Sequence, residues 1–287
     1  MGISGILLLD KDEDWTSQDA VSKLRGILRE RRIGHAGTLD PLATGLLVIL
    51  VGRATRAAEY AEAETKEYIA AFRPGIVTDT QDITGNRLSG SDVLPTEAQV
   101  RAILPRFTGP IQQIPPMYSA IKVNGQKLYD IARRGGEVER KPRNVTIHSI
   151  DYLRQEGSDH ILRIRCSKGT YIRTLCHDIG AALGCGGCMA ALRRTASGRF
   201  SIENARRIQD VTFADRDTLL PVDTLFSAHP ALTLNAAQER RLRCGNDFKT
   251  NAAEGTWRFY SESGEFLALG KVADGLGSLI KSFYEVS

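Results

Sequence analysis

The run from Leu46 to Val51 is the feature that most restricts how this chain can fold. It holds six consecutive apolar residues and directly follows residues 34–45, a segment with three glycines. An apolar run of this length beside turn signals is typical of a buried strand. Residues 4–9 have the same character. Lys66–Phe72 instead alternates between apolar and polar residues, which predicts a strand with one buried face.

Helix signals lie between these apolar runs. Thr16-Ser17-Gln18-Asp19 and Thr96-Glu97-Ala98-Gln99 are capping boxes, each followed by an apolar stripe at helical spacing. Thr170 is placed to cap a third helix, which we expect to end at Gly184. Two further strands are predicted near 145–155 and 160–166. Because strands and helices alternate irregularly, the sequence predicts an α+β fold with a mixed sheet.

The pattern of predicted secondary structure changes beyond about Asp223. One short helix, Ala236–Arg243, precedes three brief strand-like runs at 256–260, 265–270 and 278–284, which glycines separate. We therefore expect a large domain over residues 1–225 and a small β-rich domain over residues 228–287. Residues 109–144 show little periodicity, and an insertion of this length inside a compact domain is typically functional or mobile.

Positive charge is concentrated in the first domain. The net charge of the chain is +4, and residues 228–287 carry seven basic and seven acidic residues. The segment from Lys122 to Arg143 alone holds seven bases against three acids. Such a patch suits a polyphosphate partner, although solvated surface charge would give the same count.

The expected cellular compartment depends on targeting and membrane signals, which the sequence does not show. The N-terminus has a short apolar run without a basic start or a small-residue cleavage site, and no apolar stretch is long enough to cross a membrane. We expect a cytoplasmic protein with reduced thiols among its five cysteines. Cys185-Gly-Gly-Cys188 has the spacing of half a zinc site, but no second pair of ligands accompanies it, so no metal is expected.

Residues 34–45 also hold the most suggestive carboxylate, Asp40, which Pro41 follows directly. Pro41 disfavours helical geometry at Asp40, so the carboxylate would be held on a rigid loop. The same dipeptide is also a common helix start, with Asp as the cap and Pro at the first helical position. The chain has no glycine-rich nucleotide-binding loop, so nicotinamide, ATP and adenosylmethionine chemistry have no support, and no cofactor is expected.

Four stretches follow one another in a distinctive order. The first runs from Gly34 to Gly45 and continues through Thr55; the others are Lys66-Glu67-Tyr68, Pro116 to Lys122, and Cys166 to Leu175, and Leu192-Arg193-Arg194 also fits. Together they resemble the signature of the TruB family, the tRNA pseudouridine-55 synthases. The resemblance covers most of residues 1–220. The second cysteine of Cys185-Gly-Gly-Cys188 and the compact C-terminal module depart slightly from the family pattern.

The resemblance implies the pseudouridine synthase fold, a mixed, largely antiparallel sheet flanked by helices and loops. It also implies an isomerase that converts uridine 55 in the T-loop of tRNA to pseudouridine, with Asp40 as catalytic nucleophile. Flipping the base out costs a few kcal/mol, and stacking on an aromatic side chain returns about 1–3 kcal/mol. By the same resemblance, Tyr68 would stack on the uracil, and Tyr171 and Leu192 would help to shape the pocket. Arg173 would pair with Asp40, and Asp82 would join the charge network around Arg173. His35 would pack into the opened RNA loop.

Further parts of the chain gain RNA-binding roles from the resemblance. Residues 109–144 would be an insertion that clasps the T-arm, and residues from about 228 a PUA-like RNA-binding domain. The module is electrically neutral, so we expect it to give a supporting contact, in a protein that works as a monomer. The bases expected to hold phosphates are Lys122, Lys127, Arg133, Arg134, Lys141 and Arg143.

Other interpretations of the sequence remain open at this point. A non-catalytic RNA-binding or RNA-folding protein on the same scaffold would bind RNA without needing the Asp40 carboxylate. The catalytic subunit of a guide-RNA-directed pseudouridine synthase would share the core, although such subunits usually carry terminal extensions. The chemical step is also open, because Asp40 could add to the base, attack the sugar carbon, or assist proton removal from the ribose.

Overall fold

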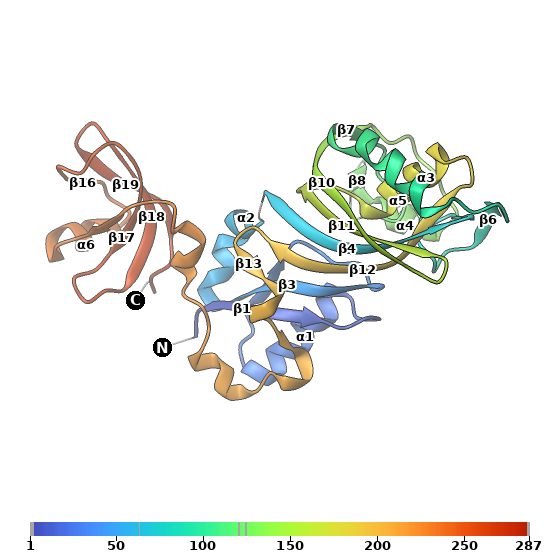
Figure 1. Cartoon of the computed structure of the whole chain (residues 1–287). Helices are drawn as coiled ribbons and strands as arrows, with labels where there is room; N and C mark the ends of the chain where they lie inside the picture. The colour runs from blue at the N-terminus through green and yellow to red at the C-terminus, as the bar shows by residue number, and fades with distance from the viewer. Residues whose placement is uncertain (1–2, 63, 120, 124, 286–287) are drawn as a thin grey trace.

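The computed structural model describes residues 3–62, 64–119, 121–123 and 125–285. Its main feature is a ten-stranded sheet that curves across the molecule (Figure 1). The strands are β1 (Gly5–Lys11), β2 (Ile33–Ala36), β3 (Ala43–Val51), β4 (Thr65–Pro74), β7 (Gly109–Gln113), β10 (Arg143–Glu156), β11 (Asp159–Ser167), β12 (Gly187–Ser197), β13 (Phe200–Ser201) and β14 (Arg206–Arg207).

The order along the sheet is β14-β1-β3-β12-β4-β11-β10-β7, with β2 paired to β3 and β13 paired to β12. Neighbouring strands are antiparallel except at two places, where β12 runs parallel to β3 and β14 runs parallel to β1. This mixed, largely antiparallel sheet, together with the helices packed on it, confirms the predicted α+β class. Two small hairpins stand apart from it, β5 (Ile76–Thr78) with β6 (Arg87–Gly90) and β8 (Lys122–Val123) with β9 (Gln126–Lys127).

The helices are α1 (Ser17–Leu28), α2 (Ala58–Ala61), α3 (Glu97–Ile103), α4 (Leu128–Arg133), α5 (Ile172–Ala182) and α6 (Ala236–Arg243). Both predicted capping boxes are present, at Thr16 and at Thr96. The prediction of a cap at Thr170 is wrong. Its hydroxyl donates to the Ser167 carbonyl, and Tyr171 precedes α5 without a capping side chain.

Strand β3 is buried on both faces, which explains its continuous apolar run. Alternate residues Leu47, Ile49 and Val51 belong to a core that α1, α3 and α5 cover. Leu46, Val48 and Leu50 belong to a second core on the opposite face. That second core is completed by residues from beyond position 199, namely Phe200, Val222, Phe226, Leu269 and Phe283.

Strand β12 lies at the centre of the sheet, although no strand was predicted there. It pairs with β4 along almost its whole length and with β3 at residues 192–194. Gly45 of β3 has φ +97°, and a Cβ at this position would lie 2.3 Å from the Arg194 carbonyl oxygen of β12. Only glycine permits this close approach of the two backbones.

The C-terminal part forms a separate five-stranded sheet at one end of the molecule (Figure 1). Its strands are β15 (Ala231–Thr233), β16 (Phe248–Lys249), β17 (Gly255–Tyr260), β18 (Phe266–Ala273) and β19 (Leu276–Ser282), and α6 packs beside them. The helix and the three strands expected from the sequence are therefore confirmed. No helix within the described ranges is long and apolar enough to span a membrane.

Candidate active site

Asp40 lies on the short connection between β2 and β3. Pro41 and Leu42 form a turn that leads straight into β3, and the Ala43 amide donates to the Asp40 carbonyl at 3.0 Å. The alternative interpretation, in which Asp40 caps a helix, is therefore wrong. The side chain of Asp40 is 42 % exposed, so its carboxylate is open to a bound molecule.

One side of this loop is fixed by β1 and the start of α1. The Ser17 hydroxyl donates to the Leu39 carbonyl at 3.1 Å and accepts from the Leu39 amide at 2.9 Å. Buried Lys11 donates to the carbonyls of Pro41 and Trp15, and burial lowers the pKa of this ammonium group to about 8. The backbone on both sides of Asp40 is thus tied to the body of the protein.

The other side of the loop is fixed by Arg194 of β12. This side chain is 1 % exposed. It donates to the carbonyl oxygen of Leu46 at 2.7 Å, of Gly37 at 2.9 Å and of Thr38 at 3.5 Å. A buried guanidinium group needs such acceptors, and here they are two carbonyls of the loop that carries Asp40 and one of β3, the strand that follows it.

Asp40 pairs with Arg173 from the first turn of α5, with 2.9 Å between Oδ2 and Nη2. Arg173 is almost completely buried and also donates to the carbonyl oxygens of Thr80 and Tyr118. Its second carboxylate neighbour is Asp82, with 3.5 Å between Arg173 Nη1 and Asp82 Oδ2. Asp82 in turn accepts hydrogen bonds from the hydroxyls of Thr80 and Thr84. Arg173 is therefore held in one orientation, and it orients the Asp40 carboxylate.

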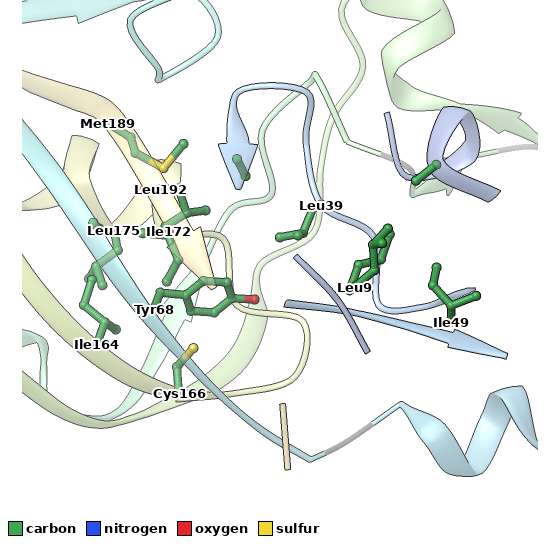
Figure 2. Close-up of a cluster of buried hydrophobic side chains, with 14 of the residues drawn as sticks. Leu9, Leu39, Ile49, Tyr68, Ile164, Cys166, Ile172, Leu175, Met189 and Leu192 are labelled. Carbon is green, nitrogen blue, oxygen red and sulfur yellow. The ribbon is translucent and has the colours of Figure 1, made fainter. Parts of the chain in front are cut away.

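A pocket opens beside this ion pair, and most of the implied site residues border it. Tyr68 on β4 is buried among apolar side chains, and its hydroxyl points toward the side where Leu39 lies (Figure 2). Burial raises the pKa of this phenol, so it remains neutral. The pocket is lined by Gly37, Thr38, Leu39, Asp40, Glu62, Lys66, Tyr68, Ser119, Gly169, Thr170, Tyr171, Ile172, Arg173 and Leu192.

The remaining predicted residues lie outside this pocket lining. His35 is on β2, where it is partly buried with its Nδ1 atom unbonded, and burial lowers its pKa. Arg134, Lys141 and Arg143 are exposed. The side chains of Lys122, Lys127 and Arg133 lie outside the part of the chain that the structure describes.

Three residues around the pocket had no predicted role. Gln113 of β7 exchanges two hydrogen bonds with the backbone of Tyr171, which fixes the start of α5. Arg194 and Lys66 belong to motifs that the sequence singled out, but nothing in the sequence indicated what either side chain contacts. Both are buried beside Gly37.

A metal site has no structural support among the described residues. Within them, no group of three or more His, Cys, Asp or Glu side chains is arranged to hold a metal ion. Cys185 and Cys188 are both buried and reduced. Burial raises the pKa of Cys188 to about 11, which disfavours the thiolate that metal binding needs.

Comparison with known proteins assigns the family. The model of the N-terminal domain of TruB family pseudouridylate synthases matches residues 25–172, and the model of the tRNA pseudouridylate synthase B C-terminal domain matches residues 173–227. The chain belongs to the TruB family. A relative named tRNA pseudouridine synthase B from Dechloromonas aromatica is 44% identical over 279 residues, which cover 95% of this chain and 93% of that protein. Another of that name, from Opitutus terrae, is 50% identical over 71% of this chain and 85% of that protein.

Solved structures show the same fold. The crystal structure of a Cbf5-Nop10-Gar1 complex contains a chain that is 25% identical to this one, with a TM-score of 0.72 over 98% of this chain and 85% of that one. An H/ACA RNP bound to a substrate RNA contains another, with 24% identity and a TM-score of 0.71 over 99% of this chain and 86% of that one. The likeness in fold therefore extends along almost the whole chain, the C-terminal sheet included.

Proposed function

We propose that this protein is a tRNA pseudouridine synthase that isomerises uridine 55 in the T-loop, with Asp40 as its catalytic nucleophile. Membership of the TruB family supports the reaction. The observation that carries the proposal is the Asp40–Arg173 ion pair at the mouth of a pocket whose buried wall is Tyr68. No other described carboxylate in that pocket lining is paired with an arginine.

The pocket has the chemistry that a flipped-out uracil requires. Tyr68, Ile172 and Leu192 offer an aromatic face and apolar edges, while Asp40 and Arg173 supply polar groups at one side. An aromatic face binds a base by stacking, and the polar groups fix its orientation. Asp40 then works next to the bond between base and ribose. The reaction breaks that bond and rejoins the base through carbon, so it consumes no oxidant and no external energy.

The basic insertion and the C-terminal module extend the contact along the RNA. Exposed Arg134, Lys141 and Arg143 are available to phosphates of the T-arm. Arg143 lies at the start of β10 opposite Gln113, which holds the Tyr171 backbone at the pocket. A phosphate contact at Arg143 would therefore lie close to the base-binding pocket. We assign the module from residue 228 onward to a PUA-like RNA-binding domain.

Tritium release from unmodified tRNA labelled at uracil C5 tests this proposal. The wild type and Asp92→Asn, which changes an exposed carboxylate beyond β6, should release tritium, whereas Asp40→Asn should release none. Binding of tRNA by Asp40→Asn should stay within a few fold of the wild type. Tritium release by Asp40→Asn would show that Asp40 is not the catalytic nucleophile. If no protein releases tritium although all bind tRNA tightly, a non-catalytic RNA-binding function replaces the enzyme.

A further inference from the structure

Lys66 is a buried cation at the pocket that the proposed mechanism does not use. It lies on β4, two residues before Tyr68 and on the same face of the strand, and it is 8% exposed. Its side chain extends toward the loop of Asp40. The Lys66 Nζ atom lies 3.1 Å, and the Arg194 Nη1 atom 3.4 Å, from the point where a Cβ on Gly37 would stand.

The cationic side chains around the pocket differ in their hydrogen-bond and ion-pair partners. Arg173 is paired with Asp40 and Asp82, and Arg194 donates to three carbonyl oxygens. Lys66 has neither a hydrogen bond nor an ion pair among the described residues, although its side chain lines the pocket. A lysine that is largely buried without an acceptor in the protein is destabilising, and its ammonium group can reach a partner from the pocket, so the position calls for an acceptor on the bound molecule.

We infer that Lys66 is a further catalytic residue, whose ammonium group contacts a carbonyl oxygen of the flipped uracil and stabilises the negative charge that the base gains during the reaction. This inference rests on the proposed function. When the bond between N1 and C1′ breaks, its electron pair stays on the base and spreads over N1 and the carbonyl oxygens. The bond between C5 and C1′ then forms, C5 loses its proton to water, and N1 gains one. Lys66 needs only to keep its charge.

The burial of Lys66 favours the base over a phosphate as its acceptor. Lys66 shares its strand face with Tyr68, the residue expected to stack on the ring. The neighbouring Lys168 offers a contrast, because it is half exposed and already paired with Glu64 at 2.7 Å. A phosphate, which stays hydrated, suits the exposed bases of residues 134–143 better than a nearly enclosed ammonium group.

The charge of Lys66 should also affect how the reaction rate depends on pH. Burial lowers its pKa, Arg194 and Lys168 lower it further, and Glu62 and Cys166 oppose them. Burial raises the pKa of Cys166 to about 11 and also raises that of Tyr68. Above its pKa Lys66 is neutral, so the rate of the wild type should fall there. Lys11, which holds the Asp40 loop and whose pKa burial lowers to about 8, also titrates at alkaline pH, so only the part of the fall that the Lys66 variants change belongs to Lys66.

The test is single-turnover tritium release at saturating enzyme, with tRNA affinity measured in parallel. Lys66→Met removes the charge and keeps most of the shape, whereas Lys66→Arg keeps the charge at every accessible pH. Lys168→Met is the matched control, because it removes a lysine charge beside the pocket without touching its lining. Thermal unfolding of each variant checks that it is folded.

We expect Lys66→Met to lose rate on the order of 10²-fold, as happens when one oxyanion donor is removed, with little change in tRNA affinity. It should lack the part of the alkaline fall that comes from Lys66. Lys66→Arg should keep more of the rate and hold it better than the wild type at alkaline pH, and Lys168→Met should match the wild-type rate at neutral pH. A wild-type rate in Lys66→Met overturns the inference, as does an arginine variant as slow as the methionine variant. Weaker binding with a smaller salt slope and an unchanged saturating rate would reassign Lys66 to a phosphate. If the wild type itself releases no tritium, the proposed function fails instead.

Discussion

Replacing Arg194 by methionine should destabilise the protein far more than the same change at its neighbour Arg193. Both arginines lie on β12, but their environments are opposite. Arg194 is 1 % exposed and donates to backbone carbonyls, whereas the Arg193 side chain is 44 % exposed and forms an ion pair with Asp10 at 2.7 Å. The pair is therefore a matched test of what a buried guanidinium group contributes.

The magnitude follows from the hydrogen bonds that Arg194 makes. Without the guanidinium group, the carbonyls of Gly37 and Leu46 are deprived of bonds of 2.9 and 2.7 Å. A buried polar group left without a partner costs about 1–3 kcal/mol, and relief from burying the charge offsets part of this sum. We expect a destabilisation of about 3 kcal/mol, which lowers the Tm of a chain of this size by roughly 6–12 °C. The pair of Arg193 with Asp10 lies at the surface on its arginine side, so we expect its loss to cost less, about 1 kcal/mol.

Thermal and urea unfolding of the wild type and the two variants measure this difference. Tritium release measures the effect on activity, because two of the carbonyls that Arg194 holds, those of Gly37 and Thr38, belong to the loop of Asp40. Arg194→Met should therefore also lose turnover at temperatures where it is still folded. Equal Tm shifts for the two variants, or an Arg194→Met variant within about 1 kcal/mol of the wild type, would refute the assignment of Arg194 as the anchor of this loop.

Other predictions follow from the same structural features. Arg173→Met leaves buried Asp82 unpaired, so unfolding in urea should show a destabilisation of about 3–5 kcal/mol, and a wild-type midpoint would contradict the network. Thiol titration of the native protein should detect Cys244 rapidly and the other four cysteines only after unfolding, because those four are buried; a second fast thiol would show that one of them is accessible. Neutralising the exposed bases of the insertion should weaken tRNA binding and flatten its salt dependence by about 0.7–0.9 for each phosphate that is no longer neutralised. An unchanged slope would mean that no phosphate is held by Arg134, Lys141 and Arg143.

The elements that the sequence predicted are those with local signals. Capping boxes mark the starts of α1 and α3, and continuous or alternating apolar runs mark β1, β3 and β4. Strand β12 has no such signal. Its sequence from Gly187 to Ser197 contains a glycine and two adjacent arginines, and the buried arginine is acceptable there only because carbonyl groups of the neighbouring strand β3 and of the loop before it accept its hydrogen bonds. That information is tertiary and cannot be read from a window of neighbouring residues.

The candidate site likewise contains some residues with a local sequence signal and others whose contacts depend on the tertiary structure. Asp40 stood out through its glycines and Pro41, but the local pattern also allowed a helix cap, and only the family resemblance decided between them. Arg173 is far from Asp40 in the chain, so periodicity could not have joined the two. Ser17 was recognised as part of a capping box, yet its hydroxyl turns out to bind the backbone of Leu39. A helix start thus also serves as a clamp on the loop, which no sequence signal distinguishes from ordinary capping.

The apolar run of β3 links the C-terminal module to the loop that carries Asp40. The run is buried on both faces, and the second face belongs to a core that includes Leu269 and Phe283 of the module. Strand β3 begins three residues after Asp40, and the loop's carbonyls are held by a side chain from the adjoining strand β12. A strand enclosed on both faces cannot shift without opening one of two cores. The module therefore contributes to the rigidity of the Asp40 loop through packing.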